Sequence, residues 1–207
     1  DANSKNVSNE SIYDVASLTK VLSTTPVVMK LIQKKMLNLH YPLSDFYDEF
    51  NKGDKKYITI RHLLTHTSGL PGYIEYYKRQ DINNKDDIIN DIIKLDLSYT
   101  PDSKMVYSDL GMILLSDIIG KVSSSSLDKL SYNYYYNPLK MNHTFFNPKE
   151  TIKSNIAPTE NDNYFRNKLL QGDVHDENAF LLGGVSGHAG LFSNATDIAK
   201  LSKLFLN

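Results

Sequence analysis

The stretch Val15-Ala16-Ser17-Leu18-Thr19-Lys20 sets a serine and a lysine three residues apart, where an extended segment over residues 11–15 meets an apolar-periodic one. On a helix, side chains at positions i and i+3 share a face, with Cβ atoms about 5–6 Å apart. The spacing therefore predicts that the Lys20 ammonium reaches the Ser17 hydroxyl through local structure alone. Unpaired N–H groups at a helix start also favour negative charge, so the stretch predicts a serine nucleophile with a lysine beside it.

The same spacing occurs a second time, in Ser126-Leu127-Asp128-Lys129. Ser126 closes a run of four serines and precedes an amphipathic segment, which is typical of an ordinary helix N-cap. Ser17, in contrast, is surrounded by apolar residues that are expected to enter the core, and a polar group placed there needs a reason. We therefore expect Ser17 to be the functional serine and Ser126 to be a cap.

The composition indicates one compact domain over residues 1–207, because 41% of the residues are hydrophobic. The net charge is 23 − 24 = −1 and the basic residues are scattered. This pattern excludes an electrostatic footprint for nucleic acid or an anionic membrane, and favours a small-molecule or peptide substrate. No apolar run approaches the roughly 18 residues that a membrane-spanning helix needs. The chain starts in a polar stretch and stops one residue after an apolar segment, so we expect it to be truncated at both ends, with room for further domains in its parent.

Apolar periodicity predicts the main helices. A helical segment from Ser17 to Met36 contains Pro26, which should divide it into two pieces. Thr59 can cap a short helix that ends near Leu64. Further helices are expected over residues 86–95, 110–122 and 127–141, followed by a last helix capped by Ser193 or Asn194.

A serine hydroxyl attacks a carbonyl only if another group takes its proton. Lys20 can do so in its neutral form, and Tyr107, at a predicted loop-to-helix junction, is the expected second proton-transfer group. His66 lies in a Thr/Ser-rich turn, where a histidine is more often a local hydrogen-bonding group than a catalyst. We favour that structural interpretation of His66.

His175 lies beside Asp176 and Glu177, which raises the question of metal ligation. A metal site would need further ligands at a suitable spacing, and no second His/carboxylate pair supplies them. We predict neither a metal ion nor a cofactor, and expect this loop to border the substrate cleft.

Three motifs, Ala16-Ser17-Leu18-Thr19-Lys20, Leu63-Leu64-Thr65-His66-Thr67-Ser68-Gly69-Leu70 and Tyr107-Ser108-Asp109-Leu110, occur in this order. Together they resemble the serine β-lactamase and penicillin-binding-protein superfamily, in its class C-like branch of D-Ala-D-Ala carboxypeptidases, esterases and related serine hydrolases. The resemblance implies an α+β, β-lactamase/transpeptidase-like fold, present here as a mostly helical part with some flanking sheet strands missing. It also implies that Ser17 is acylated, that Lys20 accepts its proton, and that Tyr107 is the second-box tyrosine.

Asp109 stands where many members of this superfamily have asparagine, a form found in esterase-like and peptidase-like relatives. By resemblance, Asp109, His175 and His188 are the candidate substrate-binding residues. His188-Ala189-Gly190 has the form of a His-x-Gly third box. The stretch Gly187–Lys200, however, resembles the glycine-rich turn and helix that precede the third box, which would place the third-box strand beyond Asn207.

The function implied by the resemblance is hydrolysis through an acyl-enzyme of a peptidoglycan peptide, a β-lactam or an ester, in an extracytoplasmic location. The alternative is a catalytically degenerate cell-wall-binding or scaffolding module with the same fold. The presence of Ser17, Lys20 and Tyr107 favours the enzyme.

Overall fold

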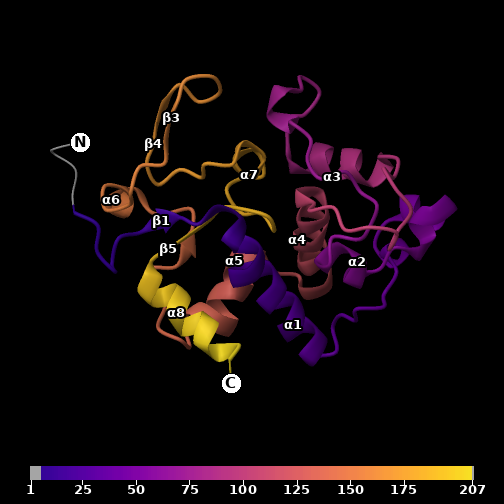
Figure 1. The fold of residues 1–207 in the computed structure, drawn as a ribbon, viewed down its shortest axis with the longest axis horizontal. Coiled ribbons are helices and arrows are strands. Elements are labelled where there is room, and N and C mark those ends of the chain that lie inside the picture. The colour runs from indigo at the N-terminus through magenta and orange to yellow at the C-terminus, as the bar shows by residue number, and fades with distance from the viewer. Residues whose placement is uncertain (1–5, 207) are drawn as a thin grey trace.

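Residues 6–206 are described by a computed structural model, in which helix α4 (Asp109–Ser123) is the central apolar element (Figure 1). The hydroxyl of the N-cap Ser108 accepts a hydrogen bond from Gly111 N at 3.2 Å, which starts the helix next to Tyr107. Helix α4 contacts α2 (Ile60–Leu64), α3 (Lys85–Lys94) and α5 (Leu127–Ser131). It therefore joins the residues before and after it in the chain into one core.

Helices α2 and α3 confirm the predicted Thr59 cap and the predicted apolar stripe. Thr59 and His62 form a capping box at the start of α2. Asn84, a cap that was not predicted from the sequence, caps α3 through a bond from Asp87 N. The apolar stripe of α3 is buried, as its 3–4 residue spacing predicts; it consists of Ile88, Ile89, Ile92 and Ile93.

The segment that carries Ser17 and Lys20 breaks before Pro26, close to where the sequence predicts. It forms a 3₁₀ turn (Ala16–Leu18), a π-helix (Lys20–Thr24) and helix α1 (Thr25–Gln33). The predicted division into helical pieces near Pro26 is confirmed, but the part before it is 3₁₀ and π in type, and α1 ends at Gln33 and not at Met36. The predicted helix over 127–141 also changes, into α5 and a π-helix (Tyr132–Tyr136).

The sheet is small and antiparallel. Strand β5 (Leu191–Ser193) lies between β1 (Tyr13–Asp14) and β2 (Phe145–Phe146), with Phe192 opposite both Asp14 and Phe145. A separate hairpin pairs β3 (Glu160–Asp162) with β4 (Lys168–Leu170). These strands have two or three residues each, which confirms a mostly helical α+β fold. The resemblance implies a glycine-rich turn and a helix over Gly187–Lys200, but Leu191–Ser193 within this stretch form the buried central strand.

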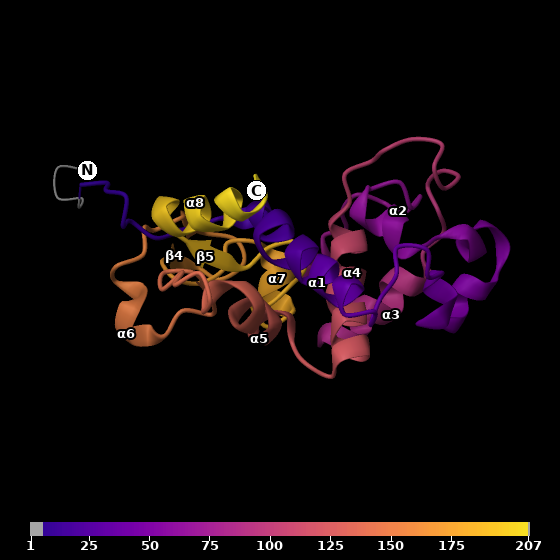
Figure 2. The same ribbon diagram turned by 90° about the horizontal axis from the view of Figure 1, so that it is seen from below.

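The sheet and α8 (Ala195–Leu204) lie at one end of an elongated molecule, and α2 and α3 lie at the other, with α1 and α4 between them (Figures 1 and 2). One hydrophobic cluster runs through both ends, from Leu22 to Leu201. The short helices α6 (Glu150–Lys153) and α7 (Glu177–Leu181) border the hairpin and the centre (Figure 2). The molecule thus places the turn with Ser17 at the junction of the sheet and the helices.

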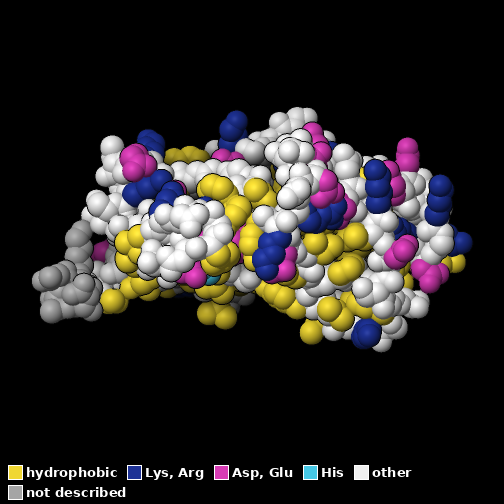
Figure 3. Space-filling view, turned by 90° about the horizontal axis from the view of Figure 1, so that it is seen from above, with side chains coloured by type: hydrophobic (Ala, Val, Ile, Leu, Met, Phe, Trp, Pro, Cys, Tyr) yellow, Lys and Arg dark blue, Asp and Glu magenta, His cyan; other side chains and the backbone are white. Residues whose placement is uncertain are grey.

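The face shown in Figure 3 carries acidic and basic side chains that are interspersed, with apolar patches between them. Within residues 6–206, no single helix has the length and apolar composition to cross a membrane; only the bent pair Asp109–Ser123 and Leu127–Tyr136 meets that test, by length and composition alone.

Gly187→Ala is expected to destabilise the protein by about 1–3 kcal/mol, the usual cost of overpacking. A Cβ at this position would lie 2.0 Å from the carbonyl oxygen of Met112 in α4. The loop has little room to retreat, because Gly187 O accepts a hydrogen bond from Thr24 Oγ1 at 2.7 Å. Denaturant unfolding of the natural full-length protein measures the change.

Gly120→Ala in α4 is the matched control, because a Cβ there meets nothing within 4 Å. Helix propensity predicts a gain of up to about 1 kcal/mol for this variant. A Gly187→Ala protein at least as stable as the wild type would show that the loop before β5 is not fixed against α4.

Candidate active site

Ser17 lies on the 3₁₀ turn that directly follows β1, and it is exposed to solvent. The residue before it, Ala16, has a φ of 46°, an uncommon conformation for a residue with a side chain. Asp14 Oδ1 accepts a bond from Ala16 N at 2.7 Å, and the Thr19 hydroxyl donates to Ala16 O at 2.7 Å. Thr19 Oγ1 also accepts a bond from Leu191 N at 3.1 Å. The turn is therefore fixed to the central strand by bonds that do not use the Ser17 side chain.

Lys20 is buried beneath Ser17, with 4% of its surface exposed. Its ammonium donates to Ser17 Oγ at 2.9 Å and to His188 O at 3.0 Å, and it forms an ion pair with Asp109 Oδ1 at 2.7 Å. Two of the three N–H groups of the ammonium thus have hydrogen-bond acceptors, whereas Asp109 Oδ1 lies at ion-pair distance without hydrogen-bond geometry. The predicted contact between Lys20 and Ser17 is confirmed, although the backbone between them is not α-helical.

Tyr107 lies over the same ammonium, with Lys20 Nζ 4.7 Å from the centroid of its ring. The sequence predicts that the Tyr107 hydroxyl converges with Ser17 and Lys20 within hydrogen-bonding distance. The structure instead brings the ring face to Lys20, in a cation–π contact, and 53% of Tyr107 is exposed. Asp109 is the first residue of α4, where the helix dipole favours a carboxylate.

His66 joins this group although the sequence favours a purely structural role for it. Its ring packs against Tyr107, with centroids 4.7 Å apart, and it lines the same cavity as Ser17 and Lys20. The cavity has a volume of about 410 Å³ and is open to solvent. Its lining consists of Val15, Ser17, Leu18, Lys20, Val21, Thr25, Leu64, His66, Tyr107 and Met112.

His188 reaches the site through its backbone. Its side chain is 1% exposed, and the ring nitrogens lie 2.7 Å from Ser186 Oγ and 2.9 Å from Asp176 Oδ1. Burial raises the pKa of the Asp176 carboxyl, but the hydrogen bond and charge of His188, the bond from Ala179 N and the charge of Lys20 together outweigh burial and hold that pKa below its usual range. Both ring nitrogens of His188 thus have partners inside the protein, whereas its carbonyl accepts a hydrogen bond from Lys20.

His175 lies near the turn that carries Ser17, but it does not line the cavity. Its side chain is partly exposed, and Nε2 lies 2.7 Å from Glu160 Oε2, whereas its backbone N donates to Asp14 Oδ2 at 2.7 Å. The Asp14 carboxylate therefore links the loop at His175 with the turn before Ser17. Burial raises the pKa of Asp14, whereas the hydrogen bonds from His175 N and Ala16 N act to lower it.

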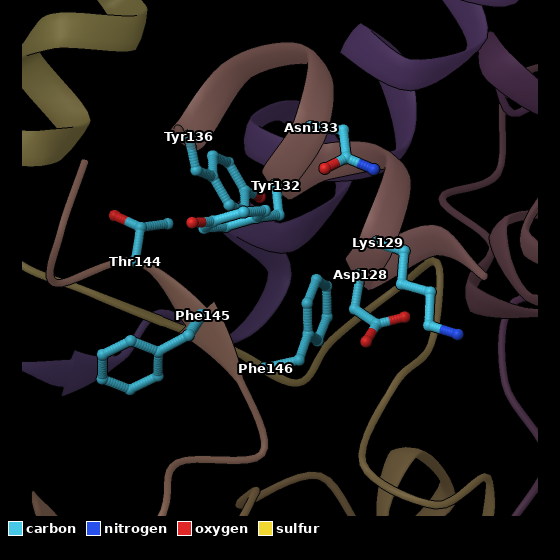
Figure 4. A pocket seen from close by; sticks show the side chains of 8 residues that line it. All are labelled: Asp128, Lys129, Tyr132, Asn133, Tyr136, Thr144, Phe145 and Phe146. Carbon is cyan, nitrogen blue, oxygen red and sulfur yellow. The ribbon is translucent and has the colours of Figure 1, made fainter. Parts of the chain in front are cut away.

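A second pocket, of about 260 Å³, lies beside α5 and contains Lys129 of the other Ser-x-x-Lys spacing (Figure 4). Ser126 is the N-cap residue of α5, as predicted, and does not line this pocket. The pocket has Asp128 and Lys129 on one side and the rings of Tyr132 and Tyr136 on another. Among residues 6–206, no group of three or more His, Cys, Asp or Glu side chains is arranged to hold a metal ion.

A protein-family model described as Beta-lactamase matches residues 1–207 of this chain. The chain belongs to the Beta-lactamase family. It is 34% identical to the N-acetylmuramyl-L-alanine amidase of Bacillus subtilis, over 95% of this chain and 50% of that protein. It is 37% identical to a "Putative D-alanyl-D-alanine carboxypeptidase" of Escherichia coli K12, over 95% of this chain and 51% of that protein. The chain thus spans about half the length of the curated relatives it matches.

Solved structures agree with this Beta-lactamase family assignment. The octameric penicillin-binding protein homologue from Pyrococcus abyssi matches with a TM-score of 0.75 and 26% identity, over 96% of this chain and 46% of that one. A class C β-lactamase from Rhodobacter sphaeroides matches in fold, with a TM-score of 0.76 and 17% identity, over 100% of this chain and 54% of that one. The expected fold of this Beta-lactamase-family chain is confirmed.

Two contributors to the site of this Beta-lactamase-family chain were not identified as site residues from the sequence. For Asp14 the signal is its position, because it ends the strand three residues before Ser17. His66 lies in the second of the three motifs, but its approach to Tyr107 depends on folding. The polar residues of all three motifs, and not only those of the Ser17 motif, are therefore candidate site residues.

Proposed function

We propose that this chain carries the nucleophile of a serine hydrolase that forms an acyl-enzyme on cell-wall peptides, with a D-alanyl-D-alanine end as the first candidate. The observation that carries the proposal is the 2.9 Å contact between Ser17 Oγ and Lys20 Nζ beside a cavity open to solvent. The names of the amidase and carboxypeptidase relatives support peptide substrates of the cell wall. Such substrates lie outside the cytoplasm, so we place the protein there as part of the proposal.

In the proposed reaction, Ser17 Oγ attacks the carbonyl carbon while its proton passes to Lys20, which must first be a neutral amine. The C–N bond to the leaving group then breaks, and the leaving nitrogen takes up a proton. Tyr107 lines the cavity and is partly exposed, so its hydroxyl is available to relay that proton. Water finally cleaves the Ser17 ester, which releases the acid and restores the hydroxyl.

Asp109 and His188 have positioning roles in this scheme. Asp109 balances the charge of Lys20 from 2.7 Å, and the His188 carbonyl fixes the side chain from the strand side. Two anchors from different parts of the fold leave Lys20 little freedom to turn away from Ser17. A proton acceptor fixed in this way reacts without further ordering of its side chain.

The test is a substrate panel on the natural full-length protein. It comprises a diacyl-L-Lys-D-Ala-D-Ala peptide, N-acetylmuramyl-L-alanine, a fluorescent penicillin and a nitrophenyl ester. We expect release of D-alanine from the peptide and, by mass spectrometry, a covalent penicillin adduct on the Ser17 peptide. Cleavage of N-acetylmuramyl-L-alanine or of the ester alone would move the proposal to an amidase or an esterase. If no member is cleaved and no adduct forms, the chain is a non-catalytic module.

A further inference from the structure

His66 holds the segment around Tyr107 from both sides. Its backbone carbonyl accepts a hydrogen bond from Val106 N at 2.9 Å, and its ring nitrogen Nδ1 accepts one from Ser108 N at 3.1 Å. Between these two bonds, the His66 and Tyr107 rings pack against each other, with their centroids 4.7 Å apart and an angle of 40° between the ring planes. One residue thus binds the amino acids before and after Tyr107 and also contacts its side chain.

The backbone of His66 suits this arrangement and is itself anchored. Its φ of 58° lies in the left-handed region, and this turns the carbonyl and the ring toward the same neighbouring segment. The carbonyl also accepts a bond from the Tyr99 hydroxyl at 3.2 Å. Tyr107 is separated from His66 by many residues in the chain, so these contacts are tertiary and not the result of local sequence.

The bond from Ser108 requires that Nδ1 carries no proton, so the neutral ring must hold its proton on Nε2. The charged groups that face the ring are Lys20 and Asp109. Burial and the nearby Lys20 charge lower the pKa of His66, and they outweigh Asp109 and the Ser108 bond, which act in the other direction. His66 is therefore neutral at pH 7 and gains a charge only in more acidic solution.

We propose that His66 is a positioning residue that holds Tyr107 over Lys20, and that protonation of its ring releases Tyr107. If Nδ1 carried a proton, its N–H would face the N–H of Ser108, and the hydrogen bond between them would be lost. The protonated ring would also place a second positive charge close to Lys20. Both effects weaken the contact that places Tyr107. The inference rests on the role proposed above for Tyr107, which itself touches Lys20.

Two substitutions separate the ring from the backbone. Glycine and asparagine both accept a positive φ, so neither strains residue 66. His66→Gly removes the ring and the acceptor, whereas His66→Asn keeps an acceptor oxygen near the position of Nδ1 and cannot be protonated. His40 is an exposed histidine, and His40→Gly is the matched control.

We expect His66→Gly to lower the second-order rate constant for acylation by a fluorescent penicillin about 100-fold at pH 7.5, the order of loss that misplaced catalytic groups produce. His66→Asn should stay within about fivefold of the wild type, and His40→Gly should leave the rate unchanged. Thermal unfolding of each variant shows whether it is folded. A His66→Gly protein that is folded and reacts within twofold of the wild type would overturn the proposal.

The pH dependence of the acylation rate tests the proposal even if His66→Gly does not fold. The ratio of the His66→Asn rate to the wild-type rate should rise by about tenfold for each pH unit below the pKa of His66. Because the pKa of His66 is lowered, its ring is neutral above the ordinary histidine pKa of about 6.5. The wild-type rate is therefore expected to fall only when the pH drops below the pKa of His66. A ratio that stays constant from pH 8 to pH 4.5 would show that His66 protonation does not control Tyr107.

An NMR titration of the wild type keeps this inference distinct from the proposed function. Nitrogen shifts of His66 should report the Nε2–H tautomer, and the ring resonances of Tyr107 should move as His66 titrates. Both readouts are independent of catalysis. If they are seen but no probe acylates the protein, the proposed function fails and the positioning contact stands; if Tyr107 does not respond, the positioning role fails.

Discussion

Ser17→Ala is expected to abolish acylation by any serine-directed probe, with a fall in rate of about 10⁶-fold, the order found when an acyl-transfer enzyme loses its nucleophile. Ser17 is exposed on a turn whose backbone is fixed by Asp14 and Thr19 side chains. The alanine variant retains these bonds, because none of them uses the Ser17 hydroxyl. Its unfolding temperature should therefore stay close to that of the wild type, and intact-protein mass spectrometry should show no adduct.

Ser126→Ala provides the matched control, since Ser126 has the same spacing to a lysine but lies at the start of α5. It should be labelled as fast as the wild type. If Ser126→Ala loses labelling and Ser17→Ala keeps it, the assignment of the two serines is reversed. If both variants are labelled at the wild-type rate, neither Ser-x-x-Lys serine is the nucleophile.

Lys20→Ala is expected to lower acylation by about 10²–10⁴-fold, the usual contribution of a positioned proton-transfer group. It should also reduce stability, because the variant leaves Asp109 without its partner in a mostly buried ion pair. Breaking a buried pair by removal of one member typically costs about 3–5 kcal/mol. Stopped-flow acylation and denaturant unfolding on the same preparations measure the two effects.

The double variant Lys20→Ala/Asp109→Asn separates these effects. The double variant removes the Asp109 charge that Lys20→Ala leaves unpaired, so it should recover much of the stability that Lys20→Ala loses. It should not recover acylation. Recovery of acylation together with stability would show that Lys20 acts through the fold and not as a proton acceptor. The single variant Asp109→Asn completes the double-mutant cycle, which measures the coupling between the two residues.

Local sequence was sufficient for several parts of this protein. The capping residues Thr59 and Asn194 act at the starts of α2 and α8, because a cap is made between neighbours in the chain. The isoleucine stripe of α3 is buried as its spacing predicts. The contact between Ser17 and Lys20 is of the same local kind, since the two residues are three apart.

Local sequence failed where distant segments compete with helical geometry. Thr19, Lys20 and Thr24 bind the backbone of residues 187–191, and the chain between them forms a π-helix in place of an α-helix. Tertiary pairing also makes Leu191–Ser193 the central strand, because its backbone pairs with β1 on one side and β2 on the other. Helix propensity is a weak preference that such tertiary bonds override.

The sequence by itself determined the contact between Ser17 and Lys20, the order of the three motifs and the mostly helical α+β fold, since these depend on spacing, periodicity and caps. The tertiary structure alone decided what surrounds Lys20. Asp109 and the His188 carbonyl come from 89 and 168 residues away, and His66 meets Ser108 across 42. Such contacts form only when the core has packed, because no local rule fixes the distance between residues so far apart in the chain.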